Sequence, residues 1–190
     1  MSSHYFGLIA ENETDCNTIR EIIRRVLNHP RVRTEIRASN GCNKLRKKLV
    51  ANLNDLSSKG CNVFIIVHDL DRDRQNGCLN DETKLRSILE TLTSKVSNKH
   101  ICIPIEEIEA WFWADPEIIK SIGRSTGKAH PNPHLIKSPK EELERLSKSN
   151  NSKPRYSNNM NTELAKKLNL ELCSKRCPSF KNLIEFLRSL

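Results

Sequence analysis

Residues 62–73 read NVFIIVHDLDRD, and this stretch decides the fold. Its first half, residues 62–67, is continuously apolar from Val63 onward and rich in β-branched residues, which is typical of a strand covered on both faces in a parallel sheet. Its second half is acidic, because Asp69, Asp71 and Asp73 follow the point where the strand ends. The stretch therefore predicts a central parallel strand that carries carboxylates to the carboxyl edge of a sheet, where ligands bind in open α/β folds.

Strands and helices alternate on both sides of this run. Apolar runs or polar–apolar alternation predict three more strands, over Tyr5–Ala10, Arg31–Ala38 (an edge or half-buried strand) and His100–Ile105. Apolar residues at three- and four-residue spacing predict the helices: one capped by Thr14, one over Asn43–Ser58, one that begins at Asp81 or Thr83, and one over Glu106–Ile122. This order predicts an α/β fold over residues 1–122, with a mainly parallel, Rossmann-like sheet of four strands flanked by helices.

The composition changes after residue 122. Residues 123–137 contain two glycines, two prolines and two histidines and are expected to form a long loop. A short helix is predicted from Ser138-Pro139 onward, a polar segment follows at 149–161, and two more helices are predicted near 162–169 and 179–190. Residues 123–190 are therefore expected to form a basic loop and a small helical appendage that packs on the α/β core.

The positive charge of the chain is concentrated in this C-terminal region. The 190 residues carry a net charge of +9, yet residues 1–119 contain 17 basic and 17 acidic side chains, and residues 120–190 contain 15 basic and six acidic ones. A basic region beside a neutral body favours a polyanionic partner, and nucleic acid is the partner that we expect. Phosphate contacts are expected from basic residues that flank the loops, with simple solubility as the competing explanation: Lys137, Lys140, Lys153 and Arg155.

Length, cysteine usage and hydropathy exclude several classes of protein. A chain of 190 residues buries a core without disulfide staples. No apolar run approaches the roughly 18 residues of a membrane span, and residues 1–10 lack the basic start of a signal peptide. The seven cysteines are spread singly, so we expect reduced thiols in a cytoplasmic protein that has no contact with a membrane. Homo-oligomer formation is left open.

Acidic residues follow three of the four predicted strands. They are, in chain order, Glu11; Asp69, Asp71 and Asp73; and Glu106, Glu107 and Glu109. Because the carboxyl ends of parallel strands share one edge, these carboxylates are expected to converge, and their mutual repulsion favours a bound cation. Hard oxygen ligands suit Mg²⁺ or Mn²⁺, whose chemistry with phosphate esters includes phosphodiester hydrolysis. The competing interpretation is that these acids only cap helices or lie in solvated turns.

Three other motifs are less specific. Residues 123–128 (GRSTGK) are similar to a phosphate-binding loop, but the spacing is one residue short and no strand precedes it. Cys173 and Cys177 lack the second pair of ligands that a structural zinc site needs. His68 precedes Asp69 at the strand end, and we interpret it as a packed histidine with a fixed tautomer, with contact to the site as the alternative.

The pattern of acids resembles the Toprim (topoisomerase–primase) superfamily, in which a glutamate follows the first strand and an Asp-x-Asp follows a later apolar strand. The corresponding segments are GLIAENETD, which contains Glu11, and FIIVHDLDRD, which contains Asp69 and Asp71. A closer likeness is to short stand-alone Toprim-like proteins of the domain-of-unknown-function family 4276, which are similar to OLD-type endonucleases. EIEAWFWAD, KPRYSNN and CPSFKNLIEFL carry that likeness. The family usually has glycine after the first glutamate, where this chain has Asn12, a residue type that tolerates positive φ.

This resemblance implies a Toprim-like core and divalent-metal-dependent cleavage of DNA or RNA, often in bacterial defence against phage or mobile elements. It implies that Glu11 is a general acid/base or a metal ligand, and that Asp69 and Asp71 bind Mg²⁺ or Mn²⁺. Glu109 would complete the catalytic set, with Asp73 and Glu107 as reserve ligands. Two other functions stay open: a non-catalytic partner of an ATPase that binds nucleic acid or regulates it, and a nucleotidyl-transfer or phosphatase activity at the same site.

Overall fold

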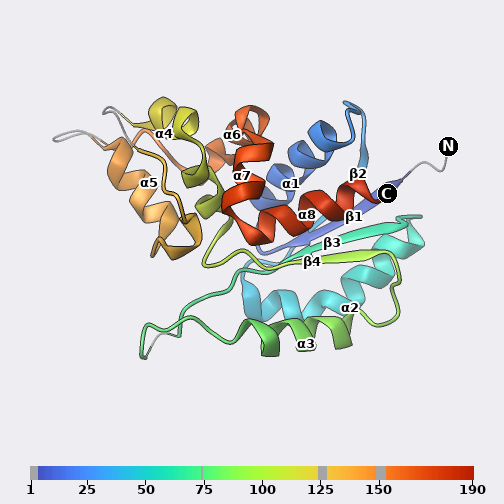
Figure 1. Cartoon of the computed structure of the whole chain (residues 1–190). Helices are drawn as coiled ribbons and strands as arrows, with labels where there is room; N and C mark the ends of the chain where they lie inside the picture. Colours follow the sequence, from blue (N-terminus) through green and yellow to red (C-terminus); the bar gives the residue numbers. More distant parts are fainter. Residues whose placement is uncertain (1–3, 74, 124–127, 149–152) are drawn as a thin grey trace.

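The computed structural model of the chain describes residues 4–73, 75–123, 128–148 and 153–190. Its centre is a sheet of four parallel strands, and helices cover both faces (Figure 1). The strands are β1 (Tyr5–Ala10), β2 (Arg33–Ala38), β3 (Val63–Val67) and β4 (Lys99–Cys102), in the spatial order β2-β1-β3-β4. The predicted α/β fold with a parallel four-stranded sheet is thus confirmed.

The burial of each strand follows from its place in the sheet. All five residues of β3, a central strand, are buried, whereas the edge strand β2 is half-buried or exposed throughout. β4 ends at Cys102 rather than at the predicted Ile105, because Pro104 has no backbone N–H to donate to a neighbouring strand. Pairing resumes only as an isolated bridge between Leu70 and Ile105, which prolongs the contact between the β3 and β4 ends.

Two apolar layers enclose the sheet. On one face, α1 (Glu13–Val26) and α8 (Pro178–Arg188) pack on a cluster that contains Leu8 and Ile65. On the other face, α2 (Cys42–Ser58) and α3 (Glu82–Leu92) pack on a cluster that contains Ile9 and Phe64. Neighbouring strand residues belong to different clusters because successive side chains of a strand point to opposite faces.

Gly7 sets how closely α2 approaches the sheet. A Cβ atom at this position would lie 2.9 Å from Cδ1 of Phe64 and 3.0 Å from Cδ1 of Leu56. Carbon atoms at that separation overlap, since the optimal distance between them is about 3.5–4.0 Å. Glycine at this position therefore permits α2 to lie directly against β1.

The C-terminal half adds helices to the same core. They are α4 (Pro116–Ile122), α5 (Pro139–Ser147), α6 (Asn161–Lys167), α7 (Leu170–Arg176) and α8, with short 3₁₀ turns η1 (Ile108–Ala114), η2 (Pro133–Leu135) and η3 (Asn158–Met160). Trp111 of η1 and Phe180 of α8 stack edge to face with ring centroids 5.0 Å apart. α6, α7 and α8 share one apolar cluster with β1 and β3 and therefore pack on the same core. The division at residue 122 stays a prediction.

The structure corrects two of the predicted helices and adds one that was not predicted. The first is capped by Asn12 rather than Thr14, because the Asn12 side chain accepts a 2.9 Å hydrogen bond from the Asp15 N–H. The predicted helix over Glu106–Ile122 is divided into η1 and α4 at Asp115, whose position before Pro116 disfavours helical backbone. The third difference is α7, which was not predicted. Across the described ranges, no helix is both long enough and apolar enough to cross a membrane.

Candidate metal centre

Asp69 is the second residue after β3, and the Oδ1 atom of its carboxylate is buried. Among the residues that the structure describes, its Oδ1 atom has no hydrogen-bond partner. Burial raises the pKa of Asp69 well above its ordinary value, and the neighbouring carboxylates of Asp15 and Glu11 raise it further. A buried carboxylate without a partner is unfavourable unless a cation or a proton neutralises it. Asp69 is therefore the centre of the candidate site.

Asp15 is the member of the site that sequence reasoning missed. It lies in the first turn of α1, is only 5% exposed, and faces Glu109 and Glu11. Burial, followed by these two carboxylates, raises the pKa of Asp15 to about 8. Its position four residues after Glu11 was the available signal, but an acid in a first helical turn is ordinary.

Glu109 lies in η1, and its carboxylate accepts hydrogen bonds from two side chains of the C-terminal region. Its Oε1 atom accepts hydrogen bonds from Asn161 Nδ2 at 3.0 Å and from Tyr156 Oη at 3.4 Å. Tyr156 Oη also lies 2.7 Å from Asn161 Oδ1, so the three side chains form one buried network. Neither Tyr156 nor Asn161 was predicted as a site residue. Tyr156 entered only as part of the KPRYSNN likeness, and both residues lie in a polar segment without periodicity.

Glu107 lies beside Glu109 and is half-buried. Its Oε2 atom accepts a 3.2 Å hydrogen bond from the backbone N–H of Lys140, at the start of α5. Burial and the neighbouring Glu109 carboxylate raise the pKa of Glu107 to about 7. The expected convergence of acids from β1, β3 and the segment after β4 is thus present for Glu11, Asp69, Glu107 and Glu109, with Asp15 added.

Glu11 and Asp71 lie on the more open side of the cluster. Glu11 follows β1, is half-buried, and accepts a hydrogen bond from the Cys42 thiol. Asp71 is exposed and lines the same surface cavity as Glu11 and Cys42. Asn12 has an extended backbone with φ of −133°, so the turn after Glu11 does not need the positive φ that glycine permits.

Two of the predicted acids are engaged elsewhere. Asp73, predicted as a reserve ligand, accepts hydrogen bonds from the N–H groups of Gln75 and Asn76 at 2.9 and 3.0 Å, as in an Asx turn. Glu106 pairs with Arg72 at 2.5 Å and accepts a 3.0 Å hydrogen bond from the backbone N–H of Ser138. Both carboxylates stabilise loops beside the site, and the structure does not bring them into the cluster.

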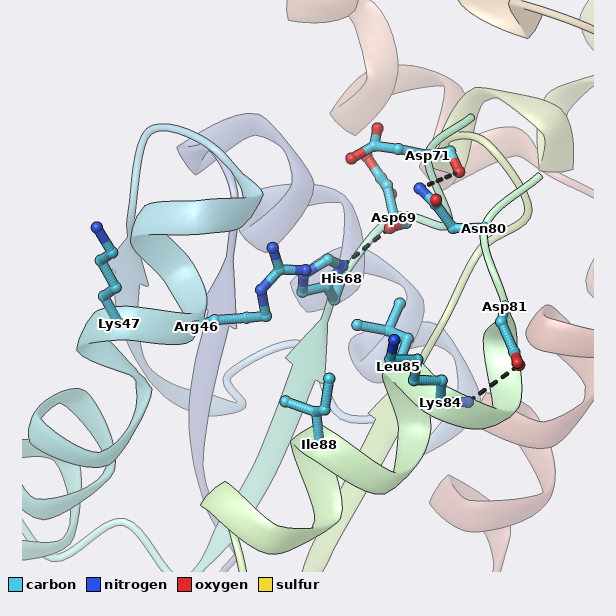
Figure 2. A pocket seen from close by; sticks show the side chains of 10 residues that line it. All are labelled: Arg46, Lys47, His68, Asp69, Asp71, Asn80, Asp81, Lys84, Leu85 and Ile88. Carbon is cyan, nitrogen blue, oxygen red and sulfur yellow. Dashed lines mark hydrogen bonds between the residues drawn. The ribbon is translucent and has the colours of Figure 1, made fainter. Parts of the chain in front are cut away.

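A cleft opens over Asp69 and Asp71. It has a volume of about 700 Å³ and is lined by α2, α3 and the segment that joins β3 to α3 (Figure 2). Arg46, Lys47 and Lys84 give its wall positive charge, while Leu85 and Ile88 provide an apolar patch, as the close-up shows. Arg46, Lys47 and Lys84 lie within residues 1–119, which have no net charge, so the charge distribution along the sequence did not indicate them as binding residues.

The predicted nucleic-acid-binding residues lie around α5. Lys137, Lys153 and Arg155 are exposed and Lys140 is half-buried. In Figure 1, α5 lies on the side of the molecule toward which the strands run, as does the connection from β3 to α3. The hydrogen bond from the Lys140 backbone N–H to the Glu107 carboxylate places the beginning of α5 beside the acidic cluster. Most of the GRSTGK segment, residues 124–127, lies outside the described residues.

Comparison with known proteins identifies a single region of similarity. A protein-family model described as "Domain of unknown function (DUF4276)" matches residues 10–188, which include the acidic cluster and the helices that pack around it. No curated protein and no solved structure matches this chain.

Proposed function

The chain belongs to the DUF4276 family, and we propose that it is a divalent-metal-dependent nuclease that hydrolyses phosphodiester bonds in DNA or RNA. The observation that carries the proposal is the buried Oδ1 atom of Asp69, which has no hydrogen-bond partner among the described residues and lies near the carboxylates of Glu11, Asp15, Glu107 and Glu109. A role in bacterial defence against phage or mobile elements is part of the proposal and rests on the resemblance to Toprim nucleases alone.

The residues present fit a hard divalent cation. Asp15 and Glu109 are buried, as is the Oδ1 atom of Asp69, and the neighbouring carboxylates help to raise the pKa of Asp15 and of Asp69. Carboxylate oxygens are the ligands that Mg²⁺ and Mn²⁺ prefer in proteins. Within the proposal, Asp69, Glu11 and Glu109 hold the cation, with Asp71 at the cleft and Asp15 and Glu107 in support.

The bound cation would stabilise the negative charge that develops on the phosphoryl oxygens during hydrolysis. Glu11 is half-buried beside the cleft, where its carboxylate can accept or return a proton of the attacking water. Arg46, Lys47 and Lys84 line the cleft above Asp69, where they would bind and orient phosphate oxygens of the substrate. The cleft therefore combines carboxylates, which would bind the cation, with basic side chains, which would bind the phosphate that the cation contacts.

The test is cleavage of labelled single- and double-stranded DNA and RNA with Mg²⁺, with Mn²⁺, and with a chelator. Asp69→Asn should abolish cleavage, because it removes the charged oxygen that faces the cluster. Asp73→Asn is the matched control: it changes the same acidic motif, and the asparagine side chain still accepts the two loop hydrogen bonds. Equal cleavage by Asp69→Asn and the unaltered protein would contradict the proposal.

A further inference from the structure

Glu11, Cys42 and His68 bring three different metal-ligating atoms together at the edge of the acidic cluster. We propose that these three residues form a zinc site, distinct in its ligand chemistry from the hard-cation centre and sharing only Glu11 with it. The three ligand atoms all lie within 4.8 Å of one another. The binding part of this inference does not depend on the proposed nuclease activity.

The distances between the ligand atoms suit tetrahedral zinc. Cys42 Sγ lies 3.3 Å from His68 Nδ1 and in hydrogen-bond contact with Glu11 Oε1. Zinc bonds of about 2.3 Å to sulfur and about 2.0 Å to nitrogen, at a tetrahedral angle, place those two atoms about 3.5 Å apart. The apo arrangement therefore needs only small side-chain movements to accept the ion.

Rigid elements hold the three ligands. Glu11 follows β1, Cys42 is the first residue of α2, and His68 follows β3. β1 and β3 are neighbouring central strands, and α2 packs on β1, so the backbone positions of all three ligands are set by the core. Cys42 lies on such an element, and Glu11 and His68 lie within one residue of one, which restricts their positions more than a place in the middle of a loop would.

The site has an open side from which zinc and a fourth ligand can enter. Glu11 and Cys42 line a surface cavity of about 370 Å³ together with Asp71, and His68 lines the adjoining cleft over Asp69. Three protein ligands with an open fourth position are the arrangement of accessible zinc sites. A water molecule would complete the coordination.

Zinc binding would break one contact of His68 and remove the proton of the Cys42 thiol. His68 Nδ1 lies 2.8 Å from the backbone oxygen of Asp69, and His68 Nε2 lies 3.4 Å from Arg46 Nη1. If Nδ1 binds zinc, the ring gives up the contact with Asp69 and carries its proton on Nε2. Arg46 has only N–H donors, so its side chain must then move away from Nε2. The Cys42 S–H bond breaks as the S–Zn bond forms, and the proton passes to solvent or buffer. Zinc binding therefore releases a proton and creates a thiolate ligand.

Sharing Glu11 would make the two metals competitors, and this consequence rests on the proposed function. Zinc held by Cys42 and His68 would withdraw the Glu11 carboxylate from the hard-cation centre and from the attacking water. Thiolate and imidazole ligands favour zinc over Mg²⁺, which prefers oxygen. Low zinc concentrations should therefore inhibit Mg²⁺-dependent hydrolysis.

The experiment titrates the full-length chain with Co²⁺, a spectroscopic substitute for zinc, and then displaces it with Zn²⁺. The unaltered protein should give an intense ultraviolet sulfur-to-cobalt charge-transfer band, which Zn²⁺ removes. Cys42→Ser should lose the band completely, and His68→Gln should weaken cobalt binding about tenfold or more. Cys78→Ser is the matched control, because Cys78 is an exposed thiol outside the site, and it should retain the band.

The outcomes separate this site from the proposed function. A Cys42-dependent band supports the zinc site even if no variant cleaves nucleic acid, and retention of the band by Asp69→Asn would show that the two centres differ. Absence of the band in a chain that unfolds cooperatively, or its persistence in Cys42→Ser, would overturn the inference. Inhibition by Zn²⁺ is then measured against each variant's own rate with Mg²⁺, and Cys42→Ser should need more zinc for half-inhibition.

Discussion

The side-chain amide of Asn161 donates a 3.0 Å hydrogen bond to the carboxylate of Glu109, 52 residues earlier in the chain. Both residues are buried, and Tyr156 Oη contacts each of them. The C-terminal region therefore does more than cover the sheet, because it orients one carboxylate of the candidate metal centre. Within the proposed function, Tyr156 and Asn161 are positioning residues.

Tyr156→Phe tests this positioning role. The substitution keeps the buried ring and removes the hydroxyl, so it should lower the free energy of unfolding by only about 0.5–1.5 kcal/mol. The kcat of the proposed hydrolysis should fall about tenfold, with little change in KM, because Glu109 loses an orienting partner. Tyr5→Phe is the matched control, since the Tyr5 hydroxyl bonds to Glu35 at the amino end of the sheet. An equal loss of kcat in both variants would argue against a specific role for Tyr156.

Much of the fold was predictable because each strand has a local signature. The run at 62–67 was expected to form a central strand and does, and β2, expected to be an edge or half-buried strand, lies at an edge. The rule that parallel strands share a carboxyl edge then placed Glu11 near Asp69, although 58 positions of sequence separate them. The helix over 106–122 was wrong because apolar spacing alone does not show where a 3₁₀ turn replaces an α-helix.

The unpredicted parts of the site depend on packing between distant segments. Asp15 and Glu13 look alike in the sequence, yet Asp15 is buried and Glu13 is exposed. The difference follows from the helix starting at Asn12, which directs Asp15 toward the sheet edge. Arg46 and Lys84 are likewise unremarkable in a charge-neutral region, and only the approach of α2 and α3 places both beside one cleft.

The metal-free protein should lose stability as the pH rises from about 5 to about 8. Asp15 has a pKa of about 8 in the folded chain against an ordinary value of 3.8, so the folded state binds more protons across this range. The stabilisation is complete below the unfolded pKa and is lost as the pH rises through the folded one. Glu107, with a pKa raised to about 7, acts in the same direction.

Asp15→Asn should reduce this pH dependence. Asparagine is uncharged at every pH, so at about pH 8 the variant should exceed the unaltered chain in unfolding free energy by an amount on the order of a few kcal/mol. Urea unfolding in a chelator at the two pH values measures the difference. Glu13→Gln changes an exposed acid in the same helical turn and should leave the pH dependence intact. A stability of the unaltered chain that increases toward about pH 8 would contradict the assigned burial of Asp15.

Mg²⁺ or Mn²⁺ should restore the stability that is lost at alkaline pH. A ligand that binds only the folded state at 100 times its Kd adds about 2.7 kcal/mol. Asp69→Asn should remove most of this gain and should itself stabilise the metal-free chain, because it eliminates a buried charge. Thermal unfolding with and without the cation measures both effects. Asp73→Asn should be stabilised by the cation as much as the unaltered chain is. If Asp69→Asn and Asp73→Asn both lost this stabilisation, the cation site would depend on the loop that follows β3 rather than on Asp69 alone.

Lys84→Gln tests whether the cleft wall binds the phosphate backbone. Lys84 lines the cleft over Asp69, whereas Lys95 lies beyond the end of α3 and is exposed. For a nucleic-acid ligand, removal of one phosphate contact should reduce the slope of log K against log salt by about 1. Fluorescence anisotropy over a series of salt concentrations, with Ca²⁺ in place of Mg²⁺, measures that slope for Lys84→Gln and for the control Lys95→Gln.

A third variant, Lys153→Gln, tests whether nucleic acid binds the basic residues of the cleft or the basic residues around α5. The charge distribution along the sequence favours the C-terminal set, which includes Lys153, whereas the geometry favours the wall that faces the acidic cluster. Because the scissile phosphate must reach Asp69, Lys84→Gln should lower both affinity and cleavage, while Lys153→Gln should lower affinity alone. A change of slope for Lys153→Gln with none for Lys84→Gln would mean that the backbone is held around α5 and enters the site from that side.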